Sequence, residues 1–128
     1  MMSNATPSGN LAVPVLSLHP VGDGLTSPSL QAAFVETVSQ AGNGTLAAAA
    51  WNDRAGHCTS TPGETVAALR ALEDRIETGR WSVSAATLNA LARAAGEDAP
   101  TFIEHTPAPL MRACANRAGA CPGYPFGE

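Results

Sequence analysis

The stretch PVLSLHPVGDGLTSPS, residues 14–29, decides the fold class of this chain of 128 residues. It continues a short apolar run, residues 11–19, which a Gly-Asp-Gly turn follows, and such a run is typical of a strand that is buried on both faces. Pro14 cannot donate a ladder hydrogen bond, so we expect it near the start of the strand or at an edge. After the turn, Ser27 can cap a helix whose first position is Pro28. A strand that leads into a helix in this way predicts an α/β fold.

The next segments extend this pattern to a βαβ unit. Residues 26–42 predict a helix that ends at Gly42, because its apolar residues recur at steps of three and four. Residues 45–53, TLAAAAWND, follow; their alanines favour a helix by propensity. The run is short, however, and lies between Gly44 and Gly56, after a strand and a helix, so a second parallel strand reached by a right-handed crossover fits better. The apolar residues of the helix are Leu30, Ala33, Phe34, Val38 and Ala41.

Two further helices are predicted. Thr61 and Glu64 have the spacing of a capping box, with Pro62 at the first helical position, and Gly79 ends this helix. Residues 84–95 predict a third, alanine-rich helix. The apolar stripe expected on the helix that begins at Pro62 consists of Val66, Leu69, Leu72 and Ile76.

The chain is too short for more than one domain. We expect a disordered polar leader over residues 1–10, one domain over residues 11–112 and a flexible tail over residues 113–128. Cys114 and Cys121 lie in that tail, where they either stay unpaired or form a disulfide under oxidising conditions.

Asp23 and His57 stand in the loops that follow the two predicted strands. Taken alone, Asp23 fits the backbone geometry of a turn and His57 fits a surface loop. The carboxyl ends of parallel strands meet at one edge of a sheet, however, and active sites of open α/β folds gather there. Their places at this edge therefore make the two residues a candidate active-site pair.

Two segments carry a resemblance to a known family. PVLSLHPVGDGLTSPS resembles the acid loop of a group of bacterial α/β-hydrolases, and RAGHCTSTPGETVAALRALEDRIETGRW, residues 54–81, resembles their histidine loop and last helix. The resemblance extends over about residues 11–112. It implies a partial α/β-hydrolase fold, with two parallel strands in a βαβ unit, about three helices and a loose C-terminal tail. It also implies that Asp23 is the acid and His57 the general base of a serine esterase-like catalytic triad that hydrolyses esters or other acyl compounds.

The nucleophile of such a triad is missing. No G-x-S-x-G elbow and no H-G-G-G oxyanion segment occur in the sequence. We therefore expect the C-terminal portion of a hydrolase, inactive alone, which pairs with an N-terminal hydrolase half or with itself and takes a small-molecule ester when complete. The alternative is a non-catalytic α/β interaction module that binds through an exposed strand edge. The sequence leaves open whether the chain is itself an enzyme.

Other classes of function are disfavoured. The net charge is −4 and the seven basic residues, all arginine, form no basic stripe, so we expect no nucleic acid partner. No apolar run approaches the roughly 18–20 residues that span a bilayer. The start resembles no signal peptide, so we expect a cytoplasmic chain, although a parent protein could be secreted. No cofactor is expected, and no metal, because His57, Cys58, Cys114 and Cys121 match no familiar zinc spacing.

The remaining candidates have packing interpretations. His19, at a strand end next to the Asp23 loop, is expected to have a packing or rim role. Cys58 is expected to pack under the histidine loop, and Trp51 and Trp81 are expected in core or edge packing. His105 is given no role.

Overall fold

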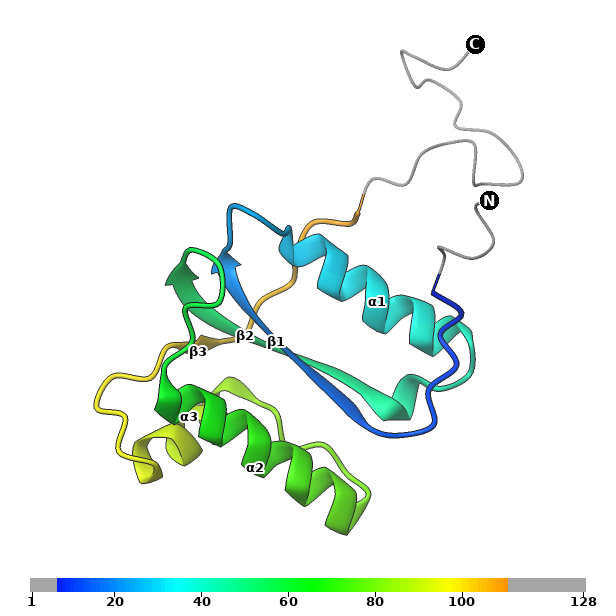
Figure 1. Cartoon of the computed structure of the whole chain (residues 1–128). Helices are drawn as coiled ribbons and strands as arrows, with labels where there is room; N and C mark the ends of the chain where they lie inside the picture. Colours follow the sequence, from blue (N-terminus) through cyan, green and yellow to red (C-terminus); the bar gives the residue numbers. More distant parts are fainter. Residues whose placement is uncertain (1–6, 111–128) are drawn as a thin grey trace.

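The computed structural model describes residues 7–110, which form a three-stranded sheet with three helices (Figure 1). Along the chain the elements are β1 (Val15–Gly22), α1 (Pro28–Gln40), a 3₁₀ turn (Gly44–Leu46), β2 (Ala47–Ala55), α2 (Pro62–Thr78), α3 (Ala85–Ala94) and β3 (Phe102–Ile103). The predicted α/β class and the predicted βαβ unit are both confirmed.

The sheet has the order β1-β2-β3. β1 and β2 run parallel, with His19 opposite Trp51, and the register shifts between Pro20 and Gly22. β3 pairs antiparallel with β2 over two residues only, which is too short to produce an alternating pattern, and the sequence did not predict it. β1 begins directly after Pro14, as expected for a residue without a backbone N–H. In the described part of the chain, no strand pairs with the other edge of β1.

The helices lie on both faces of the sheet. In Figure 1, α1 lies on one side of the strands, and α2 and α3 lie together on the other. The buried core lies on the second side, and Leu16 and Leu18 of β1 pack against it. Its members are Ala50 and Phe102 of the sheet, Ala67 and Ala71 of α2, and Leu88 and Ala92 of α3.

The predicted helix starts are confirmed. The Ser27 side chain accepts a hydrogen bond from the backbone of Ser29, and Pro28 is the first residue of α1. Both hydrogen bonds of the Thr61–Glu64 capping box are present at the start of α2. Each cap satisfies backbone N–H groups that have no partner within the helix, so each fixes where the helix begins.

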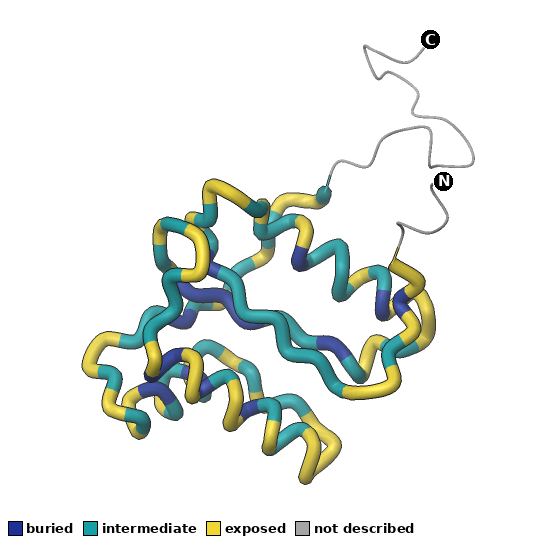
Figure 2. The backbone as a smooth tube through the Cα atoms, in the orientation of Figure 1, coloured by how far each residue is buried: buried dark blue, intermediate teal, exposed yellow. Residues whose placement is uncertain are grey.

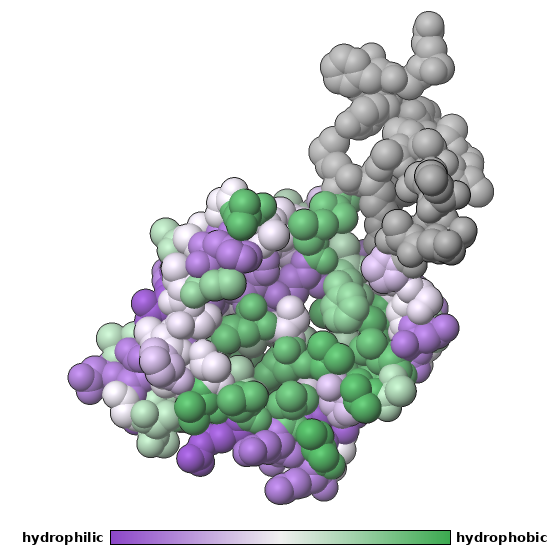
Figure 3. Space-filling view, viewed as in Figure 1, coloured by the Kyte–Doolittle hydropathy of each residue, from purple (hydrophilic) through white to green (hydrophobic). Residues whose placement is uncertain are grey.

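The predicted apolar stripe of α2 is wrong at three of its four positions, and Leu72 is half-buried. Val66, Leu69 and Ile76 are 37%, 56% and 64% exposed, whereas Ala67 and Ala71 are buried. The helix turns its small residues inward, because they allow its backbone to approach the sheet and α3 closely. Figure 2 shows the buried positions of α2 on its inner side and exposed positions on its outer side. Figure 3, drawn from the same side as Figure 1, shows apolar side chains gathered in a band across the molecule.

The described end of the predicted leader lies against α1. Gly9 is buried, and its carbonyl accepts a hydrogen bond of 3.2 Å from the Asn43 side chain. Residues 1–6 and 111–128, which include Cys114, Cys121 and the predicted tail, lie outside the described residues. Within residues 7–110, no helix is long and apolar enough to cross a membrane.

Candidate acid–histidine site

Asp23 lies in the loop between β1 and α1, where backbone and side-chain donors surround its carboxylate. Its Oδ1 accepts the backbone N–H groups of Leu25 at 2.8 Å and Thr26 at 3.1 Å. Its Oδ2 accepts the Thr26 hydroxyl at 2.7 Å. The side chain is only 1% exposed. The short polar turn that follows the strand therefore holds the carboxylate in one orientation.

His57 reaches the same carboxylate from the loop after β2. Gly56 has a φ of +99°, which favours glycine, and its N–H donates to the carbonyl of Gly22 at 3.0 Å. This bond ties the two loops together. The Nδ1 of His57 lies 2.8 Å from Oδ2 of Asp23. An ionised carboxylate only accepts hydrogen bonds, so Nδ1 is the donor and Nε2 is left to accept a proton. The imidazole is 47% exposed.

The surroundings of Asp23 keep it ionised. Hydrogen bonds from the Thr26 hydroxyl and from His57 hold the pKa of the Asp23 carboxyl well below its usual range, and the two backbone N–H groups add to this effect. Burial acts in the opposite direction and is outweighed. At neutral pH the carboxylate can therefore orient the His57 ring and stabilise its protonated form.

A cavity of about 290 Å³ opens beside this pair. Ser60 accepts a hydrogen bond from Asn52 at 3.1 Å, and the Thr65 hydroxyl donates to the carbonyl of Thr61 at 2.9 Å. The described part of the chain thus holds a carboxylate–imidazole pair, but no hydroxyl is hydrogen-bonded to the imidazole. The cavity is lined by Leu18, His19, Pro20, Asp23, Thr26, His57, Cys58, Ser60 and Thr65.

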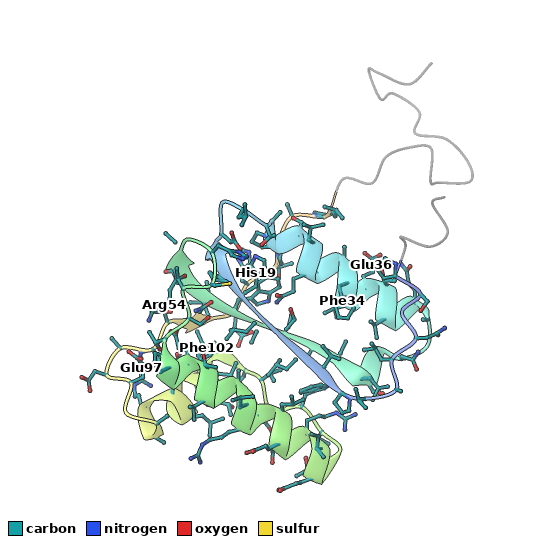
Figure 4. All side chains as sticks on the ribbon, in the orientation of Figure 1. His19, Phe34, Glu36, Arg54, Glu97 and Phe102 are labelled. Carbon is teal, nitrogen blue, oxygen red and sulfur yellow. The ribbon has the colours of Figure 1, made fainter. Side chains whose placement is uncertain are left out.

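His19 makes a contact that the sequence did not predict. Its Nε2 lies 3.2 Å from the carbonyl oxygen of Thr26 and 3.6 Å from Oδ2 of Asp23. Figure 4 shows His19 near the end of β1, beside the start of α1. Its ring also packs against Trp51, at 6.0 Å between centroids, and His105 packs on Trp51 at 5.4 Å. The spacing of four residues between His19 and Asp23 was the available signal in the sequence.

The expectation for Cys58 is wrong. Instead of packing under the histidine loop, Cys58 is exposed and lines the cavity as a free thiol. Its φ of +54° turns the chain sharply after His57 and thereby directs the side chain outward. Among the described residues, no group of three or more metal-ligating side chains is close enough to hold a metal ion.

Glu64 links the histidine loop to the core, beyond its predicted capping role. Its fully buried carboxylate accepts hydrogen bonds from Arg54 at 2.9 and 3.2 Å and from the Thr101 backbone at 2.8 Å. Burial raises the pKa of this carboxyl, but the bonds from Arg54, Thr61 and Thr101 outweigh it and lower the pKa to about 2. The start of α2 is therefore fixed to β2 and to the segment before β3.

The chain is similar to the o-phthalyl amidase of Xanthobacter agilis, with 37% identity over 87 residues. The match extends over 67% of this chain but over only 19% of the amidase, so the chain spans about a fifth of its relative's length. No family model matches the chain, and no solved structure matches it. A relative named as an amidase is a hydrolase, and a hydrolytic function is therefore supported at this general level.

Proposed function

We propose that this chain supplies the acid and the general base of a serine-type α/β-hydrolase active site, with Asp23 and His57 in these roles. The observation that carries the proposal is the 2.8 Å contact between Asp23 Oδ2 and His57 Nδ1, made at the carboxyl ends of two parallel strands. A pair of this kind is the arrangement that activates a serine hydroxyl.

In the proposed reaction, the exposed side of the His57 ring faces a serine hydroxyl that another segment provides. Nε2 accepts the hydroxyl proton while the serine oxygen attacks a carbonyl carbon, and Asp23 stabilises the resulting imidazolium. His57 then donates this proton to the leaving group, and an acyl-serine remains. Water, activated by the same nitrogen, releases the carboxylic acid and frees the serine.

The substrate class follows from this chemistry and from the relative. The acid–histidine pair suits carboxylic esters and amides, and the name of the relative points to an amide of a small aromatic acid. We propose a small-molecule acyl compound as the substrate of the complete enzyme. Because the match includes only 19% of the amidase, an o-phthalyl amide is a probe to be tried, and not an assigned substrate.

The open edge of β1 is the proposed site for the serine-bearing segment. Leu18 and Pro20 of β1 line the cavity beside His57, and no described strand pairs with the other edge of β1. A strand added there would end next to the cavity, and the loop after it could carry the nucleophile. We propose an N-terminal hydrolase portion as the partner at this edge.

A chimera tests the proposal. In the Xanthobacter agilis amidase, the matched segment is replaced by the corresponding residues of this chain, and a fluorophosphonate probe reports an activated serine. We expect the isolated chain to stay unlabelled and the chimera to be labelled on a serine outside the transplanted residues. His57→Ala should abolish the label in the chimera, and the matched control His105→Ala should not. A label on Ser60 of the isolated chain, or a chimera label that survives His57→Ala, would contradict the proposal.

A non-catalytic interaction module is the second candidate, and one observation favours it. Val66, Leu69 and Ile76 form an exposed apolar stripe on α2, in a molecule whose β1 edge has no described partner. A module of this kind would associate through that face, but it would not need Asp23 or His57. An inactive chimera, together with a partner complex that forms equally well with His57→Ala, would favour this candidate.

A further inference from the structure

Besides the contact with His57, the Asp23 loop has a second side-chain contact, which His19 of β1 makes. Two hydrogen bonds join Asp23 and Thr26 within the loop, so these bonds shape the turn without fixing its place. The backbone of Asp23 donates to Pro20 at 3.2 Å, still on the same strand end. At the far end of the turn, the Thr26 carbonyl lies 3.2 Å from His19 Nε2.

The direction of this contact follows from its atoms. A carbonyl oxygen can only accept, so His19 must carry a proton on Nε2 in order to bond with it. The ring is 13% exposed, and its packing against Trp51 fixes its plane. A mostly buried donor therefore faces the carbonyl of Thr26, the residue whose amide and hydroxyl both donate to Asp23.

We propose that His19 is a positioning residue for the acid–histidine pair. By donating from Nε2 to the Thr26 carbonyl, it holds Thr26 so that the Thr26 amide and hydroxyl stay on Asp23, and the carboxylate stays directed at His57 Nδ1. The role rests on the proposed function for its catalytic consequence only, because the orientation of His57 can be measured without a substrate or a serine.

The alternative hypothesis is that His19 only packs against Trp51. The two hypotheses differ in which substitution of His19 preserves the orientation of His57. A phenylalanine keeps the aromatic packing but leaves the Thr26 carbonyl without its donor, whereas a glutamine can put an amide N–H close to the place of Nε2. His105 provides a matched control, since it packs on the same Trp51 and, among the described residues, no hydrogen bond joins it to the Asp23 loop.

The test measures the tautomer of His57 in the complete 128-residue chain. Long-range proton–nitrogen correlation NMR at alkaline pH, where imidazole is neutral, gives the ratio of the Nδ1–H to the Nε2–H form. We expect Nδ1–H to dominate in the parent chain, in His19→Gln and in His105→Phe. In His19→Phe the ratio should move roughly 2- to 10-fold towards Nε2–H, as expected for the loss of one hydrogen bond.

Two results would overturn the role. One is an unchanged His57 ratio in a folded His19→Phe variant. The other is an equal shift in His19→Gln and His19→Phe, which would show that the ring matters only for packing. If His19→Phe does not fold, His19→Leu, which also lacks the donor, takes its place beside His19→Gln. His19→Leu should shift the ratio and His19→Gln should preserve it, and equal ratios in both would refute the role. An inactive chimera with the expected tautomer shifts would refute only the proposed function.

Discussion

Glu64→Gln should destabilise the fold far more than any exposed substitution on the same helix. Oε1 of Glu64 accepts the Thr101 backbone and hydroxyl at 2.8 Å each and one Arg54 nitrogen at 3.2 Å. Oε2 accepts the other Arg54 nitrogen and the Thr61 backbone at 2.9 Å each, and the Asn52 amide at 3.2 Å. Glutamine replaces one of these oxygens with an NH₂ group, which would face donors in place of the acceptor they need.

The magnitude follows from those contacts. Whichever oxygen is replaced, at least two donors lose their acceptor, and each unsatisfied buried donor costs about 1–3 kcal/mol. Arg54 also loses its charged partner, although its side chain is 25% exposed and water offsets part of that loss. We expect the free energy of unfolding to fall by about 3 kcal/mol, a large part of the roughly 5–15 kcal/mol that domains have.

Urea denaturation followed by circular dichroism measures this loss, with Glu73→Gln as the control on the exposed side of α2. A decrease below about 1 kcal/mol, or one equal to that of Glu73→Gln, would refute the reasoning. The pH dependence gives an independent check. The pKa of Glu64 is lowered to about 2 in the fold, so its stabilisation is complete above the unfolded pKa of about 4.3 and is lost as the pH falls through about 2. Glu64→Gln should therefore remove part of the acid sensitivity of the parent chain.

Two further predictions concern the exposed stripe and the first described residues. The double variant Leu69→Gln, Ile76→Gln should reduce the self-association of the purified chain in sedimentation velocity. Its thermal midpoint should stay nearly unchanged, since both side chains are exposed. An unaltered sedimentation profile would show that the exposed stripe of α2 does not mediate self-association. Gly9→Ala should cost about 1–3 kcal/mol, because Gly9 has a φ of +75° and an added Cβ would lie 2.5 Å from the Thr37 carbonyl oxygen; an unchanged urea midpoint would mean that this segment does not pack on α1.

Local signals in the sequence predicted most of the helices and strands. They did not predict the features that depend on packing between elements. Ser27 with Pro28, and Thr61 with Glu64, mark helix starts because caps act within a few residues. β3 was missed because two residues carry no periodicity, and their place depends on pairing with β2 and on hydrogen bonds between Phe102 and Asn89 of α3. The buried face of α2 was mispredicted because Ala67, small enough for close approach, displaced the larger apolar residues outward.

The candidate site was predictable to a similar extent. The proximity of Asp23 and His57 followed from their places at the ends of parallel strands, and the 2.8 Å contact agrees with that geometric expectation. The contact of His19 with Thr26 and the outward turn at Cys58 depend on loop conformations that no periodic pattern encodes. The ion pair of Arg54 with the buried Glu64 depends on how β2 meets α2, which local spacing does not report.

The effect of Asp23→Asn on kcat/KM in the active chimera is the most direct test of the acid role. Asparagine can keep the hydrogen-bonded geometry of the turn, but it cannot favour the Nδ1–H tautomer of His57 or stabilise its protonated form. The proposed function predicts a loss of about 10⁴-fold, the size known for this change in serine-protease triads, while Asp98→Asn in an exposed turn leaves kcat/KM unchanged. A chimera that keeps kcat/KM within about tenfold of its parent, a change of only about 1.4 kcal/mol in activation free energy, would contradict the assignment of Asp23 as the acid.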